Sequence, residues 1–159
     1  MANYLEFYLI DEENDNEVLK KVSINFLFID YLFESDEEKD PIFNTIGSFY
    51  NKLKPIKYGL LKPKDKGICW HSKTIINQFS QNDLINMFNK WISILNLLTE
   101  EYILDEFDRK KYSSEDIISD GNLKENAFHR LEVLERVKEC LELAQMIDSP
   151  QYILICEAL

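Results

Sequence analysis

Cys69 and His71 come closer to a reactive pair than any other residues of this sequence, because they flank Trp70 in the stretch GICWHS. That stretch is typical of a β-strand, in which residues two apart lie on one face. A thiolate–imidazole pair, or two ligands of a metal site, would then be geometrically allowed. Zinc sites need three or four protein ligands, however, and His129 is the only other histidine. We therefore predict a structural cysteine beside a partly buried histidine, with no catalytic and no metal-binding residue.

The acidic and glycine-containing stretches do not match known reactive loops. A calcium loop beginning at Asp116 would have Ile118 at its third position and Ala127 at its twelfth, where calcium needs oxygen ligands. The phosphate-binding glycine motifs are missing, and the sequence holds only four glycines. The sequence thus predicts a protein that is not an enzyme and has no cofactor. A small enzyme or metal protein that uses Cys69 and His71 stays open as an alternative.

Four parts of the chain have the residue pattern of strands. Tyr4–Ile10 is apolar on both faces, and Val22–Ile29 alternates, although the same spacing also fits a helix. The polar loop DEENDNE between them predicts an antiparallel hairpin. Lys54–Lys73 holds two prolines and two glycines, which predicts a short strand, a turn and a second strand that continues to Ile76. Gln151–Cys156 predicts a final strand.

Three helices are predicted from their starting residues and apolar spacing. Asp40 and Pro41 begin a helix that ends before Pro55, and Ser80 begins a second one. Asn122 begins a third helix, which ends at Ser149 and Pro150. The predicted buried stripe of this last helix consists of Phe128, Leu131, Leu134, Val137, Leu141 and Ala144. We therefore expect one α+β domain over residues 1–159, with a mostly antiparallel sheet of about four or five strands packed against three or four helices.

The charge of the chain is strongly unbalanced. Its 159 residues include 29 acidic and 18 basic side chains, so the formal net charge is −11. Seven lysines and one aspartate lie in residues 52–73, whereas acidic blocks occupy residues 11–17, 34–40, 100–108 and 115–120. Each block is explained simply as a solvated loop, but blocks that converge would form one acidic face. Such a surface repels phosphate backbones and anionic lipids and attracts basic proteins.

The sequence also indicates where the protein acts. The first ten residues, MANYLEFYLI, contain no basic region or cleavage site of a signal peptide, and no apolar run is long enough to span a bilayer. Cys69, Cys140 and Cys156 are odd in number and far apart, which does not fit a disulfide framework. We therefore expect a cytoplasmic protein with reduced thiols that binds neither a membrane nor nucleic acid directly.

A small, acidic α+β domain without a catalytic motif resembles the bacterial immunity proteins. Those proteins neutralise a cognate toxin domain, often a nuclease, of contact-dependent inhibition or related secretion systems. The amino-acid composition of the chain, which is rich in Asn, Ile and Lys, also resembles that of proteins from AT-rich bacterial genomes. The resemblance covers general features of the whole chain rather than one motif. It implies tight one-to-one binding that covers the active site or substrate groove of a basic toxin.

The expected binding face combines acids with neighbouring tyrosines, since aromatic side chains are frequent anchors at interfaces. The predicted partner-binding residues are Asp36, Glu37, Glu38, Tyr102, Asp105, Glu106, Asp108 and Tyr112. A phage-type mimic of nucleic acid that inhibits a host nuclease would use the same physics and remains an alternative. The sequence also leaves a homodimer open, through the lysine-rich stretch of one copy and an acidic block of another.

Overall fold

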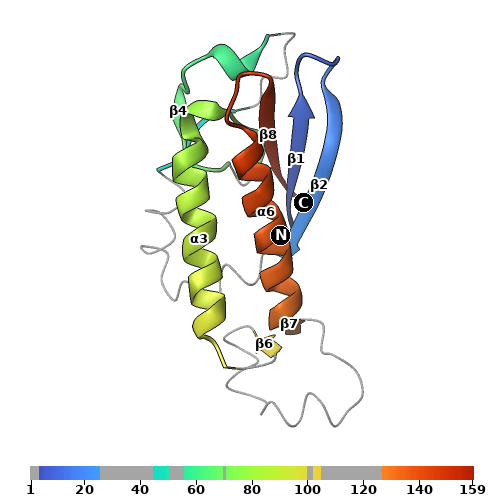
Figure 1. Ribbon diagram of the computed structural model, residues 1–159, viewed down its shortest axis with the longest axis vertical. Helices are drawn as coiled ribbons and strands as arrows, with labels where there is room; N and C mark the ends of the chain where they lie inside the picture. Colours follow the sequence, from blue (N-terminus) through green and yellow to red (C-terminus); the bar gives the residue numbers. More distant parts are fainter. Residues whose placement is uncertain (1–3, 26–44, 51–55, 70, 100–101, 105–126) are drawn as a thin grey trace.

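The computed structural model describes residues 4–25, 45–50, 56–69, 71–99, 102–104 and 127–159. These residues form an α+β domain in which two helices pack against an antiparallel sheet of six strands (Figure 1). The fold class was predicted correctly, and the sheet is wider than the four or five strands expected. The prediction of one domain over residues 1–159 also includes segments outside the described residues.

The six strands pair in the order β2-β1-β8-β5-β3-β4, and every pairing is antiparallel. The predicted hairpin and the predicted final strand are confirmed, and they supply the three strands at one side of the sheet. The strands of this sheet are β1 Tyr4–Asp11, β2 Glu17–Asn25, β3 Gly47–Tyr50, β4 Asp65–Lys66, β5 Thr74–Ile76 and β8 Tyr152–Ala158.

The hairpin between β1 and β2 turns at Asp15 and Asn16, which both have positive φ angles of 51° and 58°. Asparagine and aspartate tolerate this left-handed conformation better than most residues. Asp11 supports the turn, because its Oδ1 accepts hydrogen bonds from the amides of Glu13 and Asn14 at 3.0 and 3.2 Å. At least one acid of the loop DEENDNE, Asp11, therefore stabilises the turn of the hairpin.

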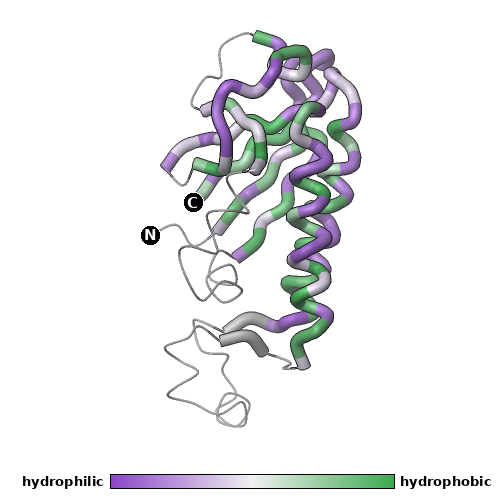
Figure 2. The backbone as a smooth tube through the Cα atoms, turned by 90° about the vertical axis from the view of Figure 1, so that its left-hand side faces the viewer, coloured by the Kyte–Doolittle hydropathy of each residue, from purple (hydrophilic) through white to green (hydrophobic). Residues whose placement is uncertain are grey.

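Helices α3 (Gln81–Leu97) and α6 (Arg130–Met146) cover one face of the sheet. Figure 2 shows the sheet and the helix pair as two layers, with the helices continuing past the ends of the strands. Buried apolar side chains lie on both faces of β1 and recur at helical spacing along α3, as the sequence predicted. The rings of Phe7, Phe88 and Trp91 meet edge to face, with centroids 5.4 and 5.5 Å apart. These contacts lie in the main core between the two layers.

The opposite face of the sheet carries a second, smaller apolar cluster. The strand register aligns Tyr8, Ile155, Ile75 and Phe49 in one row across four strands. Phe49 also packs against the Tyr58 ring, with centroids 5.2 Å apart. The full cluster of buried residues consists of Ile10, Phe49, Tyr58, Ile75, Ile153 and Ile155.

Four local predictions were wrong. Residues 47–50, placed in a helix beginning at Asp40, form strand β3 instead. The last helix begins at Arg130 rather than near Asn122, and Phe128 belongs to strand β7. The described residues of GICWHS lie in no regular element, and the strand begins only at Thr74. The stretch around Tyr58 is a 3-10 turn, η1 Tyr58–Leu60, rather than a strand.

Two further strands, β6 Tyr102–Leu104 and β7 Ala127–His129, pair with each other in a separate antiparallel ladder. They lie beside the ends of α3 and α6 that extend past the main sheet (Figure 1). At the sheet, the backbones of Tyr4 and Leu159 exchange two hydrogen bonds of 3.0 and 2.9 Å. No helix among the described residues is long and apolar enough to cross a membrane.

Candidate functional site

Tyr102 is the one predicted partner-binding residue that the structure places. It begins β6 and lies opposite His129, the last residue of β7. The acidic and aromatic residues expected to accompany Tyr102 on the binding face lie outside the described residues: Asp36, Glu37, Glu38, Asp105, Glu106, Asp108 and Tyr112. The last four of them fall between β6 and β7 in the sequence, so the β6–β7 ladder fixes where that acidic segment leaves and rejoins the fold.

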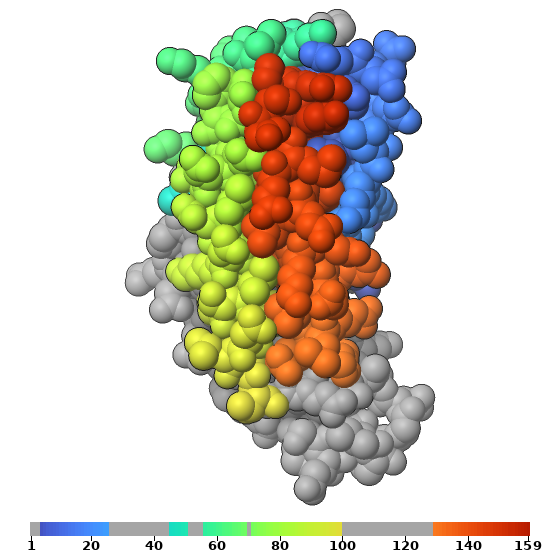
Figure 3. Space-filling view, viewed as in Figure 1, coloured from blue at the N-terminus to red at the C-terminus, as the bar shows by residue number. Residues whose placement is uncertain are grey.

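The ladder adjoins the meeting point of the two helices. Because α3 and α6 pack antiparallel, the end of α3 and the start of α6 lie side by side (Figure 3). Arg130 connects them, since its Nη1 donates to the Leu95 carbonyl at 3.2 Å. This carbonyl lies in the last turn of α3, where carbonyls lack partners within the helix. We call residues 97–99, 102–104 and 127–132 the ribbon end.

Two large apolar side chains are exposed at the ribbon end. Leu97 is 81% exposed and Leu131 is 50% exposed. Leu131 was predicted to be buried in the stripe of the last helix, and this prediction was wrong. The helix begins only at Arg130, so no preceding turn covers Leu131. Leu97 was not singled out, although it falls off the stripe that runs through Leu84, Phe88 and Leu95. Apolar side chains at this level of exposure are candidate anchors for a partner.

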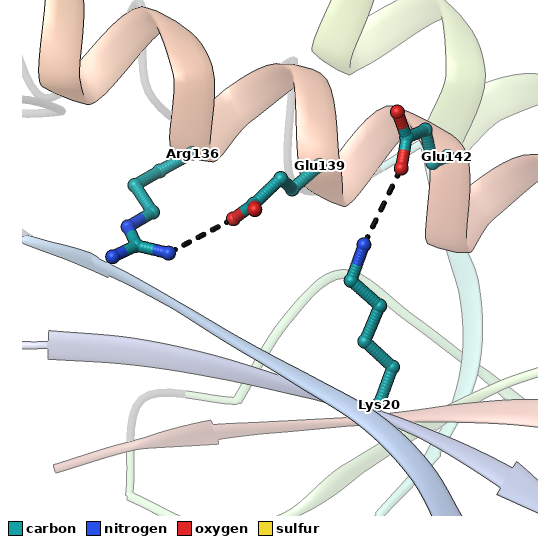
Figure 4. A network of polar contacts seen from close by, with 4 residues as sticks. All are labelled: Lys20, Arg136, Glu139 and Glu142. Carbon is teal, nitrogen blue, oxygen red and sulfur yellow. Dashed lines mark hydrogen bonds and ion pairs between the residues drawn. The ribbon is translucent and has the colours of Figure 1, made fainter.

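The acids on α6 are largely engaged with neighbouring bases. Lys20 extends from β2 to Glu142, with 3.3 Å between Nζ and Oε2, and Arg136 contacts Glu139 at 3.0 Å (Figure 4). Such exposed pairs contribute little to folding, but they neutralise charge locally. In contrast, residues 26–44 carry six acids and one lysine, and residues 100–126 carry nine acids and four bases. Most of the uncompensated negative charge therefore belongs to residues 26–44 and 100–126 of the sequence.

A buried acid organises the polar part of the other sheet face. Glu6 is 7% exposed and accepts hydrogen bonds from Ser23 at 2.9 Å and from Tyr8, while Lys21 lies 2.6 Å away. Burial by itself raises the pKa of the Glu6 carboxyl, but the bonds from Lys21, Tyr8 and Ser23 outweigh burial and lower it overall. The same contacts raise the pKa values of Tyr8 and Lys21. Glu6 is thus an ionised structural residue.

Cys69 and His71 do not share one face of a strand, because neither residue lies in a strand. Cys69 is half-buried, and its amide donates to Thr74 Oγ1 at 2.8 Å, whereas His71 is exposed. The pKa of the Cys69 thiol is lowered first by the Ser72 hydroxyl and then by the His71 backbone, rather than by the imidazole ring. Across the described ranges, no three His, Cys, Asp or Glu side chains converge as metal ligands would. The geometry on which a thiolate–imidazole pair depended is therefore contradicted.

No protein-family model, curated protein or solved structure matches this chain.

Proposed function

We propose that this protein is a non-catalytic inhibitor of the immunity-protein type, which acts in the cytoplasm by binding a basic cognate toxin domain. The ribbon end is the proposed centre of the interface. Leu97 and Leu131 would fill apolar pockets of the partner, and Tyr102 would add an aromatic contact. The acids Asp105, Glu106 and Asp108 would lie around these anchors and attract the basic surface.

The observation that carries this proposal is the exposure of Leu97 and Leu131 beside β6 and β7, the two strands between which the sequence carries Asp105, Glu106 and Asp108. Buried apolar anchors set how slowly a complex dissociates, whereas surrounding charges speed association and reject unsuitable partners. A basic nuclease toxin binds phosphate through lysines and arginines, and an acidic surface competes for the same side chains. Asp36, Glu37 and Glu38, between β2 and β3 in the sequence, would extend the acidic surface.

The proposal is tested by affinity purification from the native bacterium, with the protein as bait, at about 50 mM and about 500 mM salt. We expect one basic protein, and we expect the purified pair to bind about tenfold or more tightly at the lower salt concentration. Adding the bait should abolish the toxic or nuclease activity of the captured protein. Capture of a restriction or CRISPR nuclease would instead identify a nucleic-acid mimic.

Matched variants locate the interface on the captured partner. Leu97→Asp combined with Leu131→Asp should weaken binding by about 100-fold, because interface anchors contribute about 2 kcal/mol or more. Leu19→Asp is the control, since Leu19 is similarly exposed but lies on β2. If the parent protein, the double variant and the Leu19→Asp control bind the partner with equal affinity, the interface does not lie at the ribbon end.

A further inference from the structure

A second surface lies at the opposite end of the molecule, where the β1–β2 hairpin meets the turn η1. The Glu12 carboxylate accepts hydrogen bonds from the amides of Tyr58 and Gly59 at 2.9 and 2.7 Å. The acidic tip of the hairpin is therefore held directly against the lysine-rich part of the chain. Figures 1 and 3 show the hairpin and η1 side by side at this end.

A neighbouring turn, η2 Gln78–Ser80, is joined to η1 by side-chain bonds to the backbone. Asn77 Nδ2 donates to the carbonyls of Tyr58 and Leu61 at 2.8 and 2.6 Å, and Gln78 Nε2 donates to that of Gly59 at 2.9 Å. The two turns are therefore joined to each other and to the hairpin tip by hydrogen bonds. We call residues 12–16, 56–62 and 78–79 the hairpin–turn surface.

The joined turns expose apolar side chains instead of burying them. Leu60 is 64% exposed and Phe79 is 53% exposed, and Ile56 and Leu61 are also exposed. Leu60 and Leu61 are adjacent in sequence, and the bonds of Asn77 and Gln78 bring Phe79 to the same turn. Clusters of exposed apolar side chains on a folded domain commonly mark a binding surface.

Exposed charges of both signs accompany these apolar side chains. Lys57 and Lys62 flank η1, and both are exposed with no ion pair among the described residues. Glu13 and Asp15 are exposed on the hairpin tip beside η1. The surface thus combines exposed apolar side chains, two lysines at the ends of η1 and two acids on the adjoining hairpin tip.

We propose that the hairpin–turn surface binds the same surface of a second copy of this chain, related by a two-fold axis. A two-fold interface must be complementary to itself, since each residue meets a symmetry-related partner. Around a two-fold axis near Leu60, the exposed lysines of each copy can pair with the hairpin-tip acids of the other. Leu60 and Phe79 are then buried at the centre. This dimer leaves the ribbon ends free, so it is independent of the proposed inhibitor function.

The dimer is tested by charge exchange between two variants of the full chain. The first variant, Lys57→Glu with Lys62→Glu, leaves only acidic side chains at these four positions. The second, Glu13→Lys with Asp15→Lys, leaves only basic ones. Each variant alone should dimerise at least about tenfold more weakly than the parent protein in analytical ultracentrifugation, because like charges then face each other. An equimolar mixture of the two variants should recover the dimer as a heterodimer, which native mass spectrometry identifies.

Circular dichroism and thermal unfolding show whether each variant keeps the parent fold. Leu60→Ser provides an apolar counterpart and should also dissociate the dimer, whereas Leu97→Ser should not. A parent protein that stays monomeric up to about 1 mM, where an interaction of about −4 kcal/mol would be half-formed, overturns the proposal. So does a dimer that is insensitive to both charge reversals. A monomer that floats with vesicles containing phosphatidylserine would also overturn it, in favour of a lipid surface.

Discussion

At the scale of single residues, Glu12 and Gly59 join parts of the chain that are 47 positions apart. Glu12 is buried, and its two carboxylate oxygens satisfy amides that would otherwise lack partners at the start of η1. Gly59 is required for a different reason. A Cβ atom at this position would lie 1.9 Å from the Pro150 carbonyl oxygen, so the backbones at this junction approach too closely for a side chain.

Gly59→Ala should therefore destabilise the protein by about 1–3 kcal/mol, because the Pro150 backbone cannot yield as a flexible side chain would. The measurement is the free energy of unfolding in urea. Lys64→Ala, at an exposed position outside the hairpin–turn surface, is the control, and it should change that free energy by less than about 0.5 kcal/mol. Equal stability of the two variants would contradict the close approach.

Glu6 predicts a pH dependence of stability. Because its pKa is lowered in the folded state, its contribution is complete above the ordinary glutamate pKa and is lost as the pH falls through the folded value. Glu6→Gln should cost about 2 kcal/mol at pH 7 and much less at pH 3. Unfolding measured at both pH values checks this, with Glu132→Gln on the exposed side of α6 as the control. A loss that is the same at pH 3 would exclude the ionised role of Glu6.

At the scale of elements, the helix pair is held together at the ribbon end by a side chain that satisfies a helix terminus. Arg130 Nη1 reaches the Leu95 carbonyl across the gap between α6 and α3. Ser80, expected to begin α3 as a capping residue, instead donates its hydroxyl to the Gly47 carbonyl at 2.6 Å. Long-range bonds from neighbouring elements thus supplement the usual local caps.

Arg130→Ala should loosen the ribbon end without unfolding the sheet. We expect amide hydrogen exchange over residues 95–99 and 129–132 to become about fivefold to tenfold faster, since one hydrogen bond of about 1 kcal/mol is lost. Exchange in β1 and β8 should stay unchanged. Arg136→Ala, which removes only an exposed pair with Glu139, serves as the comparison and should leave the ribbon end as it is.

The elements also show which parts of the fold the sequence could predict. The strands β1 and β8 were predicted from short apolar runs that are buried on both faces, and the helix α3 was predicted from the helical spacing of its apolar residues. Ile46 and Phe49 have helical spacing, yet they enter different apolar clusters on opposite faces of the sheet. The turn η1 depends on Glu12, a partner far away in sequence that no local pattern reveals.

The candidate site was likewise predicted only in part. Tyr102 was predicted as a surface aromatic beside an acidic block, and the structure places its backbone at the ribbon end. Leu97 and Leu131 were missed as anchors, because their exposure depends on where two helices end and begin rather than on residue type. Helix boundaries are set by tertiary contacts such as the bond from Arg130, which a single sequence does not display.

At the scale of the whole molecule, the reaction rates of the three thiols measure how readily the domain unfolds. Cys140 and Cys156 lie in the main core, where burial raises their thiol pKa values well above the usual range. Cys69 is half-buried, and its thiol pKa is lowered. The three residues thus differ in both access and thiolate content, which are the two factors that control cysteine reactivity.

We expect one thiol to react rapidly with a disulfide reagent in the native protein and all three to react in denaturant. Cys69→Ser should remove the fast phase and leave two slow ones, whose rates follow the global unfolding equilibrium. Absorbance of the released thiolate gives both the number and the rate. A fast phase that persists in Cys69→Ser would show that the layer between the helices and the sheet opens more readily than its packing indicates.

The paired backbones of Tyr4 and Leu159 have a mechanical consequence. Because β1 and β8 are antiparallel neighbours whose outer ends coincide, a force that pulls these two residues apart acts on the last pair of hydrogen bonds first. The two strands would then peel apart one rung at a time rather than resist as a whole row. Stretched from these residues, the central strands of the sheet should separate at low force, although the same strands are among its best buried.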